Sequence, residues 1–179
     1  MAHGAQMMFI MQTMGKHPAA FLENKVLEVG SLNINGSVRG FFFNPQLYIG
    51  CDVGKGPGVD VVCPGEDLTY DEGSFDTVIS TEMMEHNPNW VKTLHNMHRM
   101  LRKNGLMVTT CAGPGRPEHG TTRSDVGSSP LTVAKGWDYY GNVSTEDIEE
   151  QLDLPEMFTE WHLEYNEHSC DTYFWGIKK

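Results

Sequence analysis

The sequence lacks a long apolar segment. None of its apolar runs approaches the roughly 20 residues that a membrane-spanning helix needs. Its first residues, Met-Ala-His-Gly, also lack the basic stretch and apolar core of a signal peptide. We therefore expect a cytoplasmic protein without a membrane partner.

Positive charge is scarce as well. Thirteen Lys and Arg stand against 24 Asp and Glu, which gives a net charge of −11 at pH 7. Proteins that bind nucleic acid normally present a basic surface to the phosphate backbone. We therefore expect a small-molecule partner and no nucleic acid. The sequence leaves open whether the protein is a monomer or a homodimer.

Metal-binding patterns are missing too. The four cysteines contain no C-x-x-C pair, and most lie in or near apolar runs, which is typical of reduced, buried thiols. His95 and His98 share a helix face, and Glu82, Glu85 and His86 precede it. Because no H-E-x-x-H pattern accompanies them, a solvated helix surface is favoured and no metal is expected.

The length of 179 residues suits one domain with a three-layer core. We expect an N-terminal helical segment over residues 1–24, with a Met-rich helix at 5–15 and a short helix at 18–24. This first helix either packs on the core or covers a pocket. A long connection over residues 112–144 is expected to be a functional loop, because such loops are uncommon in compact domains.

A strand, a glycine turn and an acidic residue form the central pattern. Residues 26–29 are typical of a buried parallel strand, and Gly30 follows them. Gly36 precedes a segment, up to residue 45, that is expected to be a short helix. Asp52 ends the next apolar run, 22 residues after Gly30, where a carboxylate can accept hydrogen bonds from ribose hydroxyls (52 − 30 = 22). The pattern predicts a nucleoside-type cofactor.

The glycine spacing does not match a dinucleotide site. The segment from Gly30 to Gly36 lacks the middle glycine of G-x-G-x-x-G, and Leu32 stands there instead. Glu28 lies two residues before Gly30, where its carboxylate can hold a cationic group or order the loop. These features disfavour an NAD-dependent reductase.

The remaining chain alternates strands and helices. Apolar runs predict strands at 47–52, 60–63, 73–81 and 106–111, and helical spacing predicts a helix over 88–103 that ends in basic residues. Ser144 is expected to cap a further helix. Residues 161–165 and 172–177 are typical of an antiparallel hairpin. Together these elements predict an α/β fold with a mostly parallel sheet.

Four blocks stand in the order found in class I S-adenosylmethionine-dependent methyltransferases: Val-Leu-Glu-Val-Gly-Ser, Tyr-Ile-Gly-Cys-Asp, Gly-Ser-Phe-Asp-Thr-Val-Ile-Ser-Thr-Glu-Met-Met-Glu-His and Met-Leu-Arg-Lys-Asn-Gly-Leu. The chain resembles a small single-domain member of this family. The resemblance implies a three-layer, Rossmann-like methyltransferase fold with a mostly parallel seven-stranded sheet and an antiparallel C-terminal hairpin. It also implies S-adenosyl-L-methionine as the cofactor and S-adenosyl-L-homocysteine as the product. The cofactor-binding residues that it indicates are Glu28, Gly30, Ser31, Leu32, Gly36, Asp52, Val53, Gly65, Glu66, Asp67, Ser80, Thr81 and Glu82.

The acceptor side is expected in the loop over residues 112–144. Its catalytic candidates are His119, as a general base with a near-neutral pKa, and Tyr139 and Tyr140. The alternatives are a loop histidine that bonds to backbone carbonyls, and tyrosines that only pack. The candidate substrate-binding residues are Arg116, Arg123, Trp137, Asp138 and His86.

The sequence therefore predicts methyl transfer to a small polar acceptor, such as a sugar-like or anionic metabolite. An alternative is a methyltransferase-like module that binds a cofactor or partner without catalysis.

Overall fold

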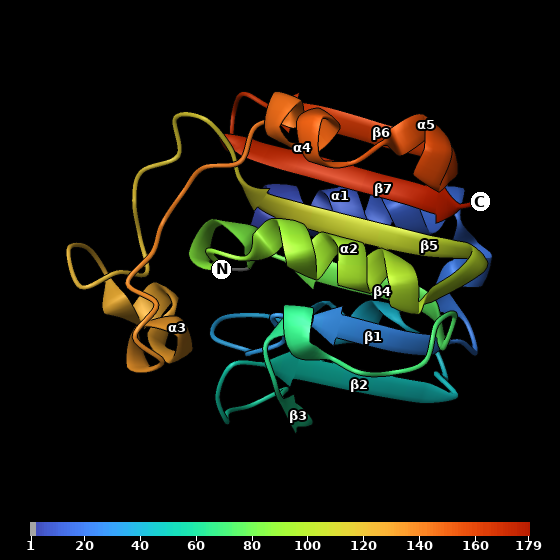
Figure 1. The fold of residues 1–179 in the computed structure, drawn as a ribbon, viewed down its shortest axis with the longest axis horizontal. Helices are drawn as coiled ribbons and strands as arrows, with labels where there is room; N and C mark the ends of the chain where they lie inside the picture. Colours follow the sequence, from blue (N-terminus) through green and yellow to red (C-terminus); the bar gives the residue numbers. More distant parts are fainter. Residues whose placement is uncertain (1–2) are drawn as a thin grey trace.

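The computed structural model describes residues 3–179, which form a seven-stranded sheet in the order β3-β2-β1-β4-β5-β7-β6 (Figure 1). Pairing is parallel from β3 to β5, whereas β7 runs antiparallel to both β5 and β6. This confirms the predicted fold class. The strands are β1 Lys25–Val29, β2 Leu47–Asp52, β3 Val61–Val62, β4 Phe75–Thr81, β5 Leu101–Ala112, β6 Phe158–Asn166 and β7 Asp171–Lys178.

Helices cover both faces of the sheet and complete three layers. The helix α1 lies on one face, and α2, α4 and α5 lie on the other (Figure 1). The short helix α3 lies apart from both layers, beyond the edge at which the parallel strands end. The helices are α1 Gly4–Lys16, α2 Trp90–Met100, α3 Pro130–Ala134, α4 Thr145–Gln151 and α5 Leu154–Met157.

Two apolar cores lie on opposite faces of the sheet. One joins the strands to α2, α4 and α5, and includes Met97, Ile148 and Phe174. The other joins the strands to α1 and includes Ile10 and Val108. Because β1, β4 and β5 are covered on both faces, most of their residues are buried.

The first helix packs against β7, near the other end of the chain. The ring of Phe9 stacks on Tyr173 with centroids 4.7 Å apart, and Nζ of Lys16 lies 4.2 Å from the centroid of the Trp175 ring. The predicted helix at 5–15 is therefore a core helix, and most of its methionines lie at its periphery. The predicted helix at 18–24 is only a 3-10 turn, Pro18–Phe21.

The prediction of a helix after Gly36 is wrong. In its place the chain makes a single 3-10 turn, Val38–Phe41, in which the amide of Arg39 donates to the side-chain hydroxyl of Ser37. Gly40 lies inside this turn and the next residues are aromatic, so helix propensity is low. Burial of Phe42, which stacks on Phe21 at 4.8 Å, fixes an extended backbone instead.

The helix predicted over 88–103 ends early, at Met100. Leu101 already pairs with Phe75 in the sheet, and Arg102 forms an ion pair with Asp76. The cation that compensates the helix C-terminus comes from the distant strand β7, because Nζ of Lys178 donates to the carbonyl oxygens of His98 and Leu101 at 2.8 Å each.

The predicted cap and hairpin are confirmed. Ser144 and Asp147 form a reciprocal capping box at the start of α4, and β6 pairs with β7 as an antiparallel hairpin. Among the described residues, no helix has both the length and the apolar character needed to cross a membrane.

Candidate active site

A pocket opens where the parallel strands end. Figure 1 shows that α3 lies beyond this edge of the sheet. The pocket spans about 870 Å³, counting space open to solvent. Residues 28–38, 51–53, 63–65 and 81–87 contribute its inner wall, and residues 128–137 contribute its outer wall. The lining residues that the sequence also indicated are Glu28, Gly30, Ser31, Leu32, Gly36, Asp52, Val53, Gly65, Thr81, Glu82, His86 and Trp137.

The glycine at the end of β1 meets two separate requirements. Gly30 has a φ of +80°, which residues with a side chain rarely adopt. A Cβ atom at this position would also lie 2.7 Å from Cβ of Met83. The amides of Gly30 and Ser31 both donate to the carbonyl oxygen of Cys51, so the turn is tied to the end of β2.

Asp52 holds the glycine loop by its carboxylate. Its Oδ2 accepts a hydrogen bond of 3.0 Å from the amide of Leu32, and its Oδ1 accepts one of 2.7 Å from the amide of Val53. Burial raises the pKa of Asp52, and these two amides oppose that effect. Leu32, which replaces the family's glycine, therefore contributes its backbone to the pocket.

Glu28 is buried in the wall of the pocket. Its Oε2 accepts a hydrogen bond of 2.8 Å from the hydroxyl of Tyr48. Burial raises the pKa of Glu28 to about 7, although the Tyr48 hydrogen bond and the positive charge of Arg39 act in the opposite direction.

Glu82 directly follows β4 and has a φ of +53°, a backbone conformation that is uncommon for a residue with a side chain. Its amide donates to the carbonyl oxygen of Thr110, and its Oε1 accepts from the hydroxyl of the same residue at 2.9 Å. The pair fixes the carboxylate beside the pocket.

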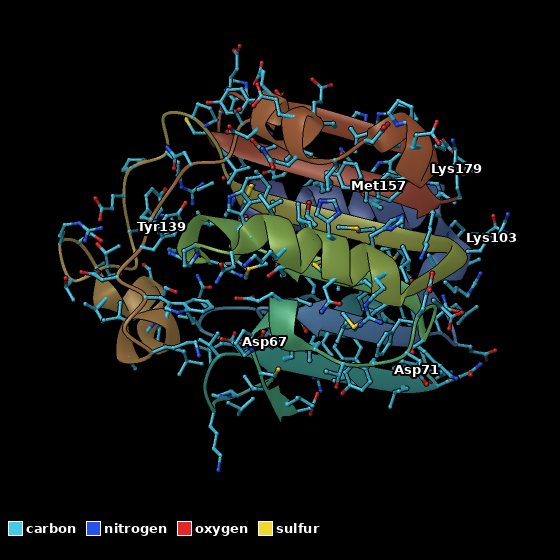
Figure 2. The ribbon with its side chains drawn as sticks, viewed as in Figure 1. Asp67, Asp71, Lys103, Tyr139, Met157 and Lys179 are labelled. Carbon is cyan, nitrogen blue, oxygen red and sulfur yellow. The ribbon has the colours of Figure 1, made fainter. Side chains whose placement is uncertain are left out.

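Three residues indicated for the cofactor lie outside the lining. The carboxylate of Glu66 accepts hydrogen bonds from Asn89 and Thr93, at the start of α2. Asp67 is exposed (Figure 2). The hydroxyl of Ser80 donates to the carbonyl oxygen of Val29 at 2.8 Å and is buried between strands.

The outer wall contains residues that the sequence analysis missed. Ser128, Ser129, Leu131 and Thr132 face the pocket together with Trp137. Leu131 packs over the turn after β2, since a Cβ atom on Gly54 would lie 2.8 Å from its Cδ2. The only sequence signal was Pro130, which opens α3. No pattern showed that this part of the loop folds over the cofactor side.

The two arginines expected to bind substrate are engaged elsewhere. Arg116 pairs with Asp171 at 2.6 Å and also donates to the carbonyl oxygen of Ser169. Arg123 lies between Glu118, at 2.7 Å, and Asp138, at 3.2 Å. None of Arg116, Arg123 and Asp138 is among the residues that line the pocket.

His119 lies one layer behind the pocket, next to His86. The two rings are 5.0 Å apart, and the ring of Tyr140 packs 5.0 Å from that of His119. Burial and His119 lower the pKa of His86 to about 3, and burial lowers the pKa of His119. Burial and the nearby Glu82 charge raise the pKa of Glu85, which adjoins both histidines, to about 8.

The tyrosines do not face the pocket. The hydroxyl of Tyr140 donates to the carbonyl oxygen of Pro117 at 3.1 Å. Tyr139 stands on the loop beyond the edge of the sheet (Figure 2). Its hydroxyl lies close to Gly141, where an added Cβ would be 2.5 Å away.

A family model described as "Methyltransferase domain" matches residues 47–109, from the start of β2 into β5. The matched segment begins after the glycine loop. No curated protein sequence matches the chain significantly.

Several solved structures share the fold at low sequence identity. A Burkholderia thailandensis 1,6-didemethyltoxoflavin-N1-methyltransferase, with its acceptor and S-adenosylhomocysteine bound, has a TM-score of 0.63 at 13% identity, over 94% of this chain and 76% of that one. The Bacillus subtilis YcgJ protein has a TM-score of 0.60 at 13% identity, over 94% and 98%.

A third structure is a Haemonchus contortus phosphoethanolamine N-methyltransferase 2, in complex with phosphomonomethylethanolamine and S-adenosylhomocysteine. Its TM-score is 0.58 at 14% identity, over 88% of this chain and 49% of that one. The family match and the shared sheet topology agree with the resemblance seen in the sequence. Residues 47–109 therefore match a methyltransferase domain model, and the chain has the fold of these solved methyltransferase structures.

Proposed function

We propose that the protein transfers the methyl group of S-adenosyl-L-methionine to a small polar acceptor bound between the sheet edge and the segment of residues 128–137. The observation that carries this proposal is the convergence of Glu28, the Gly30 loop and Asp52 on one pocket at the carboxyl edge of the sheet. In open α/β sheets, ligands bind at this edge.

The acceptor class follows from the rest of the lining. Asn87, Ser128, Ser129 and Thr132 offer neutral hydrogen-bonding groups, and Trp137 offers a flat apolar surface. Such a wall suits a small molecule that combines a ring or sugar-like face with polar substituents. No Lys or Arg of residues 3–179 lines the pocket, so an anionic acceptor would need its charge balanced in another way.

The reaction needs little from the protein beyond alignment. A lone pair of the acceptor attacks the methyl carbon, the bond from that carbon to sulfur breaks, and its electrons leave the sulfur neutral in S-adenosyl-L-homocysteine. Holding the two reactants in line removes much of the entropic barrier. A base is needed only when the acceptor atom carries a proton at the working pH.

The geometry does not favour His119 as that base. Its Nδ1 is 3.0 Å from the carbonyl oxygen of Pro117, and its other nitrogen faces Glu85. Of the two histidines in this region, His86 is the one that lines the pocket.

Calorimetric titration with S-adenosyl-L-homocysteine tests the cofactor site, with NAD as the competing ligand. Asp52→Asn and Asp52→Ala should weaken binding by roughly 1.5–3 kcal/mol, the value of hydrogen bonds to a charged group. The matched control is Asp67→Ala, which removes an exposed carboxylate outside the pocket and should leave affinity unchanged.

Unchanged affinity in both Asp52 variants would remove Asp52 from the cofactor site. Saturable binding of NAD would support the reductase alternative. No binding of either ligand to folded protein would support a module that has lost catalysis. Release of S-adenosyl-L-homocysteine on adding candidate acceptors then identifies the substrate.

A further inference from the structure

Three side chains with metal-binding atoms meet behind the inner wall of the pocket. Glu85 and His86 belong to the 3-10 turn Met84–His86 that follows β4, and His119 comes from the loop after β5. Oε1 of Glu85 lies 4.0 Å from Nε2 of His86 and 4.0 Å from Nε2 of His119. One ligand atom from each of the three residues lies within 4.8 Å of the others.

The side-chain polar atoms of Glu85 and His86 have no hydrogen-bond partners within the described residues. Glu85 is 0% exposed and His86 is 3% exposed. Neither carboxylate oxygen of Glu85 and neither ring nitrogen of His86 makes a hydrogen bond. The 4.0 Å separations are too long for hydrogen bonds between these residues. Since buried polar groups in proteins are almost always paired, these atoms point to a further ligand.

The third residue of the cluster, His119, is already oriented for coordination. A carbonyl oxygen can only accept, so Nδ1 of His119 carries a proton and donates it to Pro117 at 3.0 Å. Its Nε2 therefore presents a lone pair toward Glu85. Metal-binding histidines are commonly fixed by such a bond from the second nitrogen. Gly120 allows the close approach, because a Cβ there would lie 2.6 Å from Cε1 of His86.

A second group, His3, Glu82 and Asp171, has comparable geometry, but its side chains already form ion pairs and hydrogen bonds with one another and with neighbouring residues. Nε2 of His3 forms an ion pair with Asp171 at 3.1 Å, and Asp171 also binds Arg116 at 2.6 Å and the hydroxyl of Tyr173 at 2.9 Å. The carboxylate of Asp171 thus has its full set of partners within the protein. The contrast singles out the cluster of Glu85, His86 and His119.

We propose that Glu85, His86 and His119 bind a divalent transition-metal ion. One carboxylate and two imidazoles suit zinc, manganese, cobalt or ferrous iron better than calcium or magnesium. Ligand atoms about 2.1 Å from a tetrahedral ion lie about 3.4 Å apart, so small side-chain movements close the observed separations. Sequence spacing predicts no metal because His119 is far from Glu85 along the chain.

The site would also supply the positive charge that the pocket wall lacks. His86 belongs to both the cluster and the pocket, so a bound ion would lie at their boundary. With three protein ligands, the ion keeps an open position that an oxygen atom of the acceptor can occupy. This role rests on the proposed methyl transfer, whereas metal binding itself does not.

Titration of chelator-treated protein with Co²⁺, followed by visible absorption, tests the site without cofactor or acceptor. We expect one Co²⁺ per chain, displaced by Zn²⁺. His119→Ala and Glu85→Gln should weaken binding by more than about 100-fold, because loss of a ligand exceeds the 10–100-fold effect of losing an outer partner. His95→Ala is the matched control, since it removes an exposed histidine on α2. His3→Ala tests the second group and should bind normally.

Circular dichroism and urea unfolding identify any variant that fails to fold. If Glu85→Gln does not fold, His119→Ala still tests the site, because this substitution lies on a loop. Equal Co²⁺ binding by wild type and His119→Ala, or no binding by wild type, would overturn the proposal. Binding lost only in His3→Ala would place the ion in the other group and also overturn it. Because no cofactor is present, failure here is distinct from failure of S-adenosyl-L-homocysteine to bind.

Discussion

The hydroxyl of Tyr48 donates a hydrogen bond of 2.8 Å to Oε2 of Glu28, joining β2 to β1 beneath the pocket. This hydrogen bond lowers the pKa of the Glu28 carboxyl group, whereas burial raises it. Burial is the larger effect, so the carboxyl group keeps its proton up to a pKa of about 7.

The free energy of unfolding should therefore decrease as the pH rises from about 4.5 to about 7. The unfolded chain releases the Glu28 proton near its ordinary pKa, whereas the folded protein holds it longer, so the folded state binds more protons in this window. The loss amounts to at most about 3 kcal/mol above pH 7. Glu28→Gln stays neutral at every pH and should be more stable than wild type at pH 8 but not at pH 4.

Urea unfolding at the two pH values measures this difference. Glu72→Gln, which changes an exposed carboxyl group, should show the pH dependence of wild type. An identical pH dependence in Glu28→Gln would mean that Glu28 ionises normally in the folded protein.

Gly30→Ala should destabilise the protein and weaken cofactor binding. The substitution places a side chain at a φ of +80° and 2.7 Å from Cβ of Met83, so both the turn and its neighbour must shift. We expect a loss of about 1–3 kcal/mol in the free energy of unfolding. Gly40→Ala is the control, because nothing lies within 4 Å of an added Cβ there. Equal unfolding midpoints for the two variants would contradict the requirement for glycine at position 30.

Arg116→Ala and Arg123→Ala should differ although both arginines lie in the same loop. Removal of Arg116 leaves the fully buried carboxylate of Asp171 without its 2.6 Å partner and should cost about 2–3 kcal/mol of stability. The ion pairs of Arg123 are more exposed, so its removal should cost less than about 1 kcal/mol. Thermal unfolding measures both. If either arginine bound substrate instead, its loss would raise KM without this difference in stability.

Trp137 should report on occupation of the pocket. Its indole belongs to the outer wall, so binding of S-adenosyl-L-homocysteine should change the intrinsic tryptophan fluorescence. Trp137→Phe should lose most of that change. Trp161→Phe, which replaces a tryptophan 40% exposed on β6, should retain it. A full fluorescence response in Trp137→Phe would indicate that the segment of residues 128–137 does not close over the ligand.

Local patterns predicted the sheet well because strand ends are marked by glycine and acidic residues. The bounds of β2 follow directly from the apolar run that ends at Asp52. The same glycine and acidic residues allowed us to predict that Glu28, Gly30 and Asp52 share one pocket, since parallel strands end at the same edge of the sheet. The helix after Gly36 failed because burial of Phe42 against Phe21 is a tertiary effect that helical spacing does not contain.

Local sequence patterns could not predict how the loop over residues 112–144 contributes to the site. Nothing near His119 in the sequence indicates that a glycine beside it lets its ring approach His86 and Glu85. Arg116 was expected to bind substrate because its guanidinium group can pair with a carboxylate or a phosphate. Its partner Asp171 lies at the start of the last strand, where no sequence pattern connects the two.

The packing of α1 on β7 has a consequence for synthesis of the chain. Helix α1 must wait for β7, the last strand of this sheet in chain order, before Phe9 can meet Tyr173 and Lys16 can meet Trp175. Such contacts between distant parts of the chain slow folding. Until β7 is made, α1 lacks its contacts with Tyr173 and Trp175, although β1, β4 and β5 already offer part of its packing surface. The domain therefore completes its fold only once β7 is available, as one cooperative unit, rather than growing from α1 onward.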